Sequence, residues 1–421
     1  MLKPYFQLPR AIHVLCLGTL VNRAGTFLVP FLTLYLTTQL GLGDAFATQA
    51  MGLYGLGGIL AALTGGHLAD RIGRRTVMLA SLLGASAVLL VFGRLGSPAA
   101  ILAAVLAVSF LGEMYRPAAS AMIADLSPPE ERPRAYALMY LTINLGMTVS
   151  PIVGGFIAGH SYQWLFWGDA ATSTAYALIL LLAVRETLPA RAVRTAADGA
   201  VADVAAPAPD GPHPPLAAIA RRVLGHGVFL VFCLATHFVS LAYMQSHTTL
   251  PLYMKGLGFG PQQYGMITAV NAALIVAFQL PFTGWIARFP REALLVCGAL
   301  LTAVGFGLTG FATTLRALAG SVVVWTAGEM LQSAYLSAVV ADLAPPDLRG
   351  TYMGMVTLAY ASALMIGSPI GGLVLERYGA GALWTGSFAV ALAGAACYTA
   401  IGPAIRRAHA AHAGGAPPTG R

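Results

Sequence analysis

Long apolar runs separated by short polar segments dominate the pattern along the chain. A run of about 18 residues or more is long enough to cross the hydrocarbon core of a bilayer as a helix. We therefore predict an all-α polytopic membrane protein. Its twelve transmembrane helices, six in each half, are expected at residues 11–36, 48–68, 76–96, 99–123, 134–159, 163–184, 226–252, 262–286, 292–313, 316–340, 351–375 and 380–404.

The two halves of the chain repeat each other. The stretch 112–155 returns in altered form at 328–372, so that Gly112-Glu113-Met114 pairs with Gly328-Glu329-Met330 and Asp125-Leu126 with Asp342-Leu343. An even number of predicted spans separates the two copies, so they share one orientation and the repeat is parallel. We expect six-helix bundles at 1–184 and 223–405, a cytoplasmic linker at 185–222 and a disordered cytoplasmic tail at 406–421.

Composition supports the membrane interpretation. Hydrophobic residues make up 57% of the chain and charged residues only 10%, against roughly a quarter charged in soluble domains. The net charge of +8 does not indicate nucleic-acid binding, because the basic residues are scattered without interleaved aromatics. The four cysteines are expected to be small buried hydrophobes, so we predict no disulfide, metal site or cofactor.

The basic residues favour one orientation. Most of them fall in segments on one predicted side, whereas the other side has only Arg94, Lys255, Arg316 and Arg377. Cytoplasmic loops are enriched in Lys and Arg. We therefore expect an inner (plasma) membrane protein with both termini in the cytoplasm.

The loop after the second predicted span reads GHLADRIGRRTVML from Gly66 to Leu79. It closely resembles the major facilitator superfamily signature G-x-L-A-D-R-x-G-R-R/K-x-x-x-L, and the duplicated twelve-span layout extends the resemblance over essentially the whole chain. In that family the motif latches the two halves together. The resemblance implies a conformational latch, in which Asp70 meets the positive amino-terminal end of the eleventh span near Gly350. The latch motif comprises Gly66, Asp70, Arg71, Gly73, Arg74 and Arg75. Alternatively, its arginines only set the topology.

The fifth span contains Gly146, Ser150, Pro151, Gly154 and Gly155. These residues resemble the family's antiporter motif G-x-x-x-G-P-x-x-G-G, with serine in place of the central glycine. Small residues four apart permit close helix contact, and proline bends a helix. Ordinary helix packing is the alternative interpretation. The arginine that many drug and proton antiporters carry early in the fourth span would fall near Leu106, which is apolar.

Few ionisable groups lie deep in the predicted spans, and each is a functional candidate because a charge at the bilayer centre costs about 2.5 to 3.5 kcal/mol. Arg23 and Glu113 are expected at the same depth, and Arg116 shares the face of Glu113 three residues later. Glu113 therefore has two possible cationic partners. A static pair that holds helices together is the alternative.

Glu329 takes the place of Glu113 in the second half, but Gln332 replaces the arginine. A buried carboxylate without a cation can bind and release a proton near neutral pH. Glu329 is thus the better candidate for a proton carrier, and Trp325, one turn earlier, is expected to offer a surface to an apolar or cationic ligand. His237 is interpreted as a satisfied polar residue or a cavity residue, and Asp169 as a residue near water at the outer end of the sixth span.

These features favour a monomeric secondary transporter of the bacterial drug:proton antiporter group. It would export amphipathic or cationic small molecules in exchange for protons by alternating access. An uptake symporter or facilitator for a sugar or other metabolite has the same predicted fold. A non-transporting receptor or an enzyme is a further alternative. Against an enzyme, the polar loops are short, and no H-E-x-x-H, G-x-S-x-G or phosphate-binding glycine motif is present in the sequence.

Overall fold

The structure is a computed structural model that describes residues 7–128, 131–187, 216–286, 288–345 and 348–413. All regular structure in these residues is helical. The elements are α1 Arg10–Ala24, α2 Leu28–Leu34, the π-helical turn η2 Tyr35–Gln39, α3 Asp44–Ile72, α4 Arg74–Phe92, α5 Pro98–Leu126, α6 Arg132–Ala158, α7 Tyr162–Ala183, α8 Leu216–Leu224, α9 Gly227–Thr248, α10 Leu250–Gly256, α11 Pro261–Ile286, α12 Arg291–Thr309, α13 Leu315–Leu343 and α14 Arg349–Ala413.

These helices account for the twelve predicted spans. The first span is α1, α2 and η2 in sequence, and the seventh is α9 followed by α10. The helix α14 holds the last two spans, which join at Gly379, where the backbone is not helical (φ 79°, ψ 176°). A positive φ of this kind favours glycine. Nine helical stretches in the described residues are long and apolar enough to cross a membrane, and the longest, Arg349–Ala410, contains two predicted spans.

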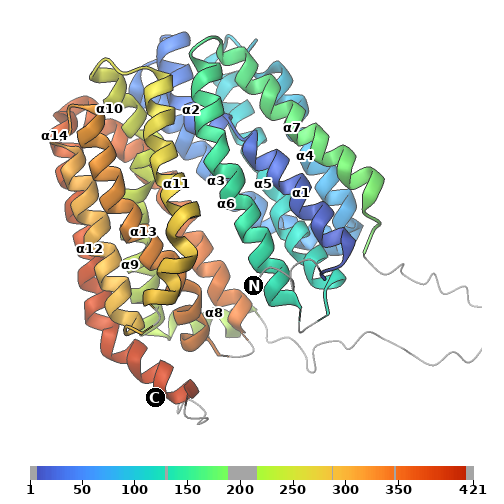
Figure 1. The fold of residues 1–421 in the computed structure, drawn as a ribbon, viewed down its shortest axis with the longest axis vertical. Helices are drawn as coiled ribbons and strands as arrows, with labels where there is room; N and C mark the ends of the chain where they lie inside the picture. Colours follow the sequence, from blue (N-terminus) through green and yellow to red (C-terminus); the bar gives the residue numbers. More distant parts are fainter. Residues whose placement is uncertain (1–6, 129–130, 188–215, 287, 346–347, 414–421) are drawn as a thin grey trace, which may run out of the picture.

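The two repeats form two helical bundles that lie side by side (Figure 1). The helices α1 to α7, blue to green, make the N-half, and α8 to α14, yellow-green to red, make the C-half. Each half has its own buried apolar cluster, around Met122 and Tyr176 in the N-half and around Phe232 and Tyr398 in the C-half. A third cluster crosses between the halves, where Phe31 meets Tyr264 edge to face with ring centroids 5.7 Å apart. The parallel two-bundle prediction is confirmed.

Two predicted irregular segments contain helix. Residues 216–222 of the predicted linker lie in α8, and residues 406–413 of the predicted disordered tail continue α14. The tail prediction was wrong at 406–413 because side chains there have tertiary partners. Arg406 Nε lies 2.7 Å from Glu292 Oε1, and His409 Nδ1 lies 3.2 Å from Asp342 Oδ2. Residues 188–215 and 414–421 lie outside the described residues.

Among the described residues, the closest contacts between the halves gather toward one end of the molecule. We call the end where α1 begins and α14 ends the terminal face, and the other end the opposite face (Figure 1). Close approaches join α6 to α11 at Gly155 and Gly265, and α3 to α14 at Gly52 and Pro369. Lys255 Nζ adds contacts at this end, 3.4 Å from the Thr37 carbonyl oxygen and 3.9 Å from Asp44 Oδ1. The structure is therefore closed at the opposite face.

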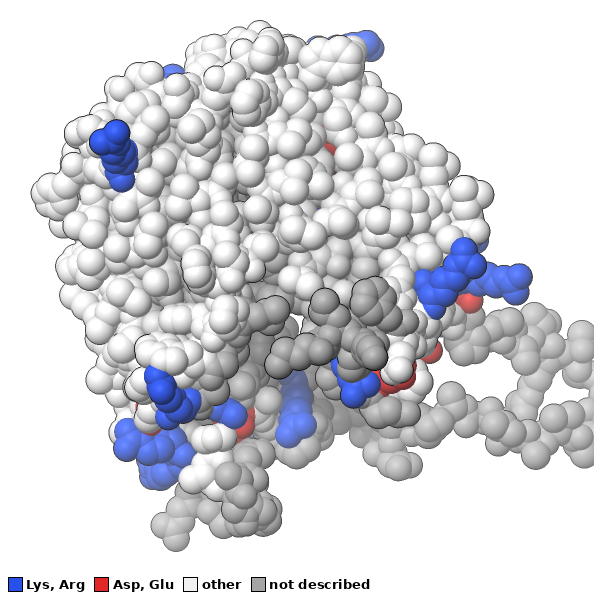
Figure 2. All heavy atoms as spheres, viewed as in Figure 1, with Lys and Arg blue, Asp and Glu red and all other residues white. Residues whose placement is uncertain are grey.

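Charge is distributed unevenly over the surface. Figure 2 shows Lys and Arg mostly around the lower end, which is the terminal face, with a broad band of uncharged atoms above it. Such a band suits the hydrocarbon region, where a charged side chain is costly.

Candidate functional site

A cavity with an empty volume of about 1410 Å³ lies between the two halves. We call it the central cavity. Its described lining comes from α1, α2, α3, α5 and α6 of the N-half and from α9, α11 and α13 of the C-half, so neither half forms it alone. Most of the lining is apolar, and the charged groups in it are Arg23, Glu113, Arg116 and Glu329. All four were predicted from the sequence.

The N-half wall carries a compensated carboxylate. Glu113 Oε2 accepts a hydrogen bond from Arg116 Nη1 at 2.8 Å, and Glu113 Oε1 lies 3.8 Å from Arg23 Nη1. Arg23 is itself buried and donates to the Tyr115 hydroxyl at 2.7 Å. Both predicted cationic partners of Glu113 are therefore in place, and this carboxylate lies between two arginines.

The C-half wall carries a carboxylate without a cation. Glu329 Oε1 accepts from the Tyr243 hydroxyl at 3.0 Å, and Glu329 Oε2 accepts from Asn271 Nδ2 at 2.8 Å. Both donors are neutral. The predicted asymmetry between the two repeated glutamates is thus present in the structure: one is ion-paired, and the other has only hydrogen bonds.

Trp325 packs within the C-half wall and exposes little of its ring to the cavity. It lines the central cavity but is only 3% exposed. Its ring stacks on Phe306 with centroids 5.4 Å apart and meets Tyr243 edge to face at 5.9 Å. The expected open aromatic surface is therefore not available in this conformation, because the neighbouring rings cover it. Trp325 instead helps to hold the tyrosine that binds Glu329.

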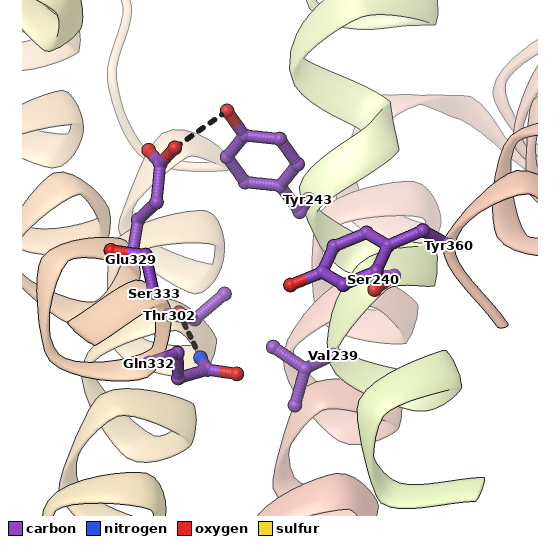
Figure 3. A pocket seen from close by; sticks show the side chains of 8 residues that line it. All are labelled: Val239, Ser240, Tyr243, Thr302, Glu329, Gln332, Ser333 and Tyr360. Carbon is purple, nitrogen blue, oxygen red and sulfur yellow. Dashed lines mark hydrogen bonds between the residues drawn. The ribbon is translucent and has the colours of Figure 1, made fainter. Parts of the chain in front are cut away.

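A second pocket, with an empty volume of about 420 Å³, lies beside Glu329 (Figure 3). We call it the C-half pocket. Gln332 lines it but does not bond to Glu329: its Nε2 donates to Thr302 Oγ1 at 3.3 Å. Seven further residues line the pocket: Val239, Ser240, Tyr243, Thr302, Glu329, Ser333 and Tyr360.

His237 lies away from the central cavity. Its Nδ1 is 3.1 Å from both the Ala359 carbonyl oxygen and Ser362 Oγ, and it is not among the residues that line the cavity. Of the two interpretations of His237, the structure therefore supports the one in which its ring is a hydrogen-bonded polar group. Sequence reasoning overlooked Tyr243 and Asn271, because neither is ionisable at neutral pH. An amide inside the apolar run ITAVNAALIVAF was the available signal for Asn271.

The antiporter-like motif packs α6 against two partners. A Cβ at Gly146 would lie 2.6 Å from Arg23 Cβ, and one at Gly154 would lie 2.6 Å from a ring carbon of Phe31. Ser150 Oγ donates to the Thr26 carbonyl oxygen at 2.8 Å, at the break between α1 and α2. Gly155 instead faces α11, as does the carbonyl of Pro151. The predicted close helix contacts are present, and they join the first, fifth and eighth spans.

Among the described residues, the partners of the latch motif lie in the N-half and at Glu186, at the start of the predicted linker. Asp70 is exposed and pairs with Arg74 Nη2 at 3.2 Å, while Arg74 Nε lies 3.0 Å from Asp125 Oδ2. The nearest atom to a Cβ at Gly66 would be Cβ of Pro117, in α5. Gly73 has a φ of 104°, which favours glycine, and leads into α4. The backbone N–H groups of Arg74 and Arg75 donate to Glu186 at 2.9 and 3.1 Å, and Arg71 is exposed.

Asp169 does not reach water as the sequence suggested. It is 6% exposed and lies close to the break between α1 and α2, where its Oδ2 accepts from the Leu28 N–H at 3.3 Å. The prediction was wrong because the break leaves backbone donors free inside the bundle, and a carboxylate stabilises the amino-terminal end of a helix.

Replacing Asp169 with Leu is expected to lower the free energy of unfolding by roughly 1 to 3 kcal/mol, because the buried donor at Leu28 loses its acceptor. Asp169→Asn keeps an acceptor of the same shape and should retain most of the stability. The free energies of unfolding of both variants are measured on the purified proteins in mixed detergent micelles. Equal stability of the Leu variant and the unsubstituted protein would remove this role from Asp169.

The sequence matches the family model described as Major Facilitator Superfamily, over residues 15–262 and again over 233–420. These ranges cover nearly the whole chain. The chain belongs to the Major Facilitator Superfamily. Members of this family are transporters, so the central cavity between the halves is the natural place for a carried molecule.

Relatives within this family carry names that indicate different activities. The chain is 25% identical to a Na(+), Li(+), K(+)/H(+) antiporter of Planococcus maritimus over 90% of this chain and 93% of the relative. It is 25% identical to the multidrug resistance protein MdtH of Edwardsiella ictaluri over 86% of each. A solved POT family transporter in complex with a thioalcohol-conjugated peptide aligns with a TM-score of 0.76, at 18% identity, over 94% of this chain and 97% of that one. The likeness to the solved structure supports the fold alone.

Proposed function

We propose that this superfamily transporter is a proton-coupled exporter of amphipathic or cationic small molecules. The observation that carries the proposal is the asymmetry of the two repeated glutamates. The described hydrogen-bond partners of Glu329 are the neutral side chains of Tyr243 and Asn271, whereas Glu113 has two arginines. A buried carboxylate without a counter-charge changes its protonation when its surroundings change. Glu329 would carry the proton, and Glu113 would organise the cavity.

The orientation of the chain supports export. By the positive-inside rule the terminal face lies in the cytoplasm, so the structure corresponds to a state closed on the outer side. A cargo would enter the central cavity from the cytoplasm or its adjoining leaflet. Rocking of one half against the other would then close the terminal face and open the opposite face. The apolar majority of the cavity lining, together with the carboxylate of Glu329, suits an amphipathic cation.

Reconstituted liposomes test this proposal directly. Proton flux is measured while the protein is offered ethidium, tetraphenylphosphonium, phospholipids, sugars, Na⁺ and K⁺ in turn; the last two are included because of the name of the Planococcus relative. We expect lipophilic cations to drive proton movement in the opposite direction. Co-directional movement of protons and a sugar would instead favour an uptake symporter. No proton movement with any of the compounds would contradict coupling.

The latch remains a proposal for the other conformation. Asp70 is exposed here and its only described cation is Arg74 on the same loop. In a state closed at the terminal face, the carboxylate would lie at the amino-terminal end of α14, which begins at Arg349. A charge at a helix terminus contributes about 0.3 to 2 kcal/mol.

The substitution Asp70→Asn is therefore expected to raise the labelling rate of a cysteine at position 147, in the central cavity, by roughly two- to tenfold. The population closed at the terminal face loses the helix-terminus contact. Maleimide labelling in membranes measures the rate, in a background where the four native cysteines are replaced by alanine. Glu376→Gln removes an exposed charge elsewhere on α14 and is the matched control. Unchanged labelling in the Asp70 variant would place the latch at another residue.

A further inference from the structure

Glu329 lies between two separate compartments. The central cavity is lined by both halves of the protein, whereas all eight residues that line the C-half pocket belong to the C-half. Tyr243 and Glu329 line both. The carboxyl group can therefore exchange with either space.

Most of the residues that line the C-half pocket carry a polar group that can bind water. Six of its described side chains carry hydroxyl or amide groups: Ser240, Tyr243, Thr302, Gln332, Ser333 and Tyr360. Figure 3 shows the Gln332 amide oxygen turned away from Thr302, and the Tyr360 hydroxyl directed toward the space between α13 and α9. A buried space holds water when it is roomy and offers the water two to four polar partners. This pocket meets both conditions.

The pocket extends from Glu329 toward the terminal face. The helix α13 runs from the opposite face at Leu315 to the terminal face at Leu343, so Gln332 and Ser333 lie about one turn nearer the terminal face than Glu329. Ser333 is exposed. Water can therefore reach this side of the pocket at Ser333, which also lies beside Tyr140 of α6.

The titratable neighbours of Glu329 on the side of this pocket are tyrosines. Besides Glu329, the titratable groups that face it are the phenols of Tyr243 on α9, Tyr360 on α14 and Tyr140 on α6. His247 lies beside Tyr243 on the central-cavity side. Among the described residues, no arginine or lysine lines the C-half pocket. In the central cavity, by contrast, Arg23 and Arg116 share one carboxylate, Glu113, so the N-half wall keeps a net positive charge that opposes the entry of hydronium.

We propose that protons reach Glu329 from the terminal face through the C-half pocket and not through the central cavity. This inference rests on the proposed role of Glu329. A hydronium in the pocket gives its proton to the carboxylate and is left as water, and release runs in reverse. The Gln332 amide and the Tyr360 hydroxyl hold the connecting water. Because this route avoids the central cavity, Glu329 can change its protonation while a cargo occupies that cavity.

Time-resolved infrared spectroscopy after a pH jump tests the route without any cargo. The full chain in lipid nanodiscs should show a carboxylic-acid band that Glu329→Gln removes. In the separate variants Gln332→Leu and Tyr360→Phe we expect the same band and the same titration midpoint to within a few tenths of a pH unit, but about tenfold slower growth of the band. Tyr398→Phe is the matched control, because the Tyr398 hydroxyl bonds to Thr236, which is outside the pocket. It should keep the unaltered rate.

The two proposals fail in different ways. Growth of the band at the unaltered rate in both pocket variants would overturn the route and leave Glu329 as the proton carrier. A spectrum in which no band depends on Glu329 would overturn both. Tyr360→Phe removes a single oxygen atom, so it tests the route even if the Gln332 variant does not fold.

Discussion

The variant Glu329→Gln is expected to lose pH-gradient-driven accumulation of substrate, down to the level of protein-free liposomes, while it retains binding and substrate exchange. Glutamine has nearly the shape of a protonated glutamate, and its amide oxygen still accepts from Tyr243 or Asn271. The cavity should therefore keep its form. Exchange of bound for free substrate requires no net proton transfer, whereas accumulation against a gradient does. Counterflow and pH-driven uptake in the same liposomes separate the two.

Glu113→Gln is the matched comparison, because Glu113 occupies the repeated position in the N-half. This change leaves Arg23, which is buried, without its counter-charge. The loss of one partner from a buried ion pair costs about 3 to 5 kcal/mol. We expect impaired folding or binding in place of selective uncoupling. If Glu329→Gln protein still accumulated substrate in response to a pH difference, the assignment of the proton to Glu329 would be wrong.

The second large effect is expected from Gly265→Val at the contact between α6 and α11. A Cβ at position 265 would collide with the Pro151 carbonyl oxygen and lie 3.1 Å from the Gly155 Cα. Backbone atoms cannot move aside as a side-chain end can. Overpacking of this kind costs roughly 1 to 3 kcal/mol, and the cost applies only while the opposite face is closed. The ratio of the two conformations should therefore shift by roughly 5- to 150-fold toward the state open at that face.

Spin-label distances measure this shift. One label pair at positions 160 and 311 reports on the opposite face, and another at 134 and 349 reports on the terminal face; all four positions are exposed. The distance across the opposite face should lengthen in Gly265→Val, and the distance across the terminal face should shorten. Gly386→Val is the control, since a Cβ there meets no atom within 4 Å. Identical distance distributions in the Gly265 variant and the unsubstituted protein would exclude this contact as a determinant of the conformation.

Local sequence patterns were sufficient to predict the architecture and the two ion pairs of Glu113. Span length and polarity are properties of short windows, and the repeat is visible by eye, so the two bundles could be predicted. The pairing of Glu113 with Arg116 followed from a spacing of three on one helix, and that with Arg23 from equal depth in the membrane. The lack of an arginine beside Glu329 was equally visible, because Gln332 stands in the repeated position.

Contacts between distant segments were decided by tertiary structure. The partners of Glu329 come from α9 and α11, which lie 86 and 58 residues away along the chain. Their rotation about the helix axis is set by packing, so no local pattern identifies them. Asp169 illustrates the same limit: its acceptor role depends on the break between α1 and α2.

Hydrophobic length and buried charge act residue by residue, so the membrane-spanning class, the duplicated halves and the charged residues of the cavity could all be predicted from the amino-acid pattern alone. The packing of the helices settled which neutral groups bind Glu329, that Trp325 is covered, that Asp70 pairs with Arg74, and that the halves close at the opposite face. Each of these depends on how whole helices are placed against one another, and that placement is the sum of many contacts spread along the chain.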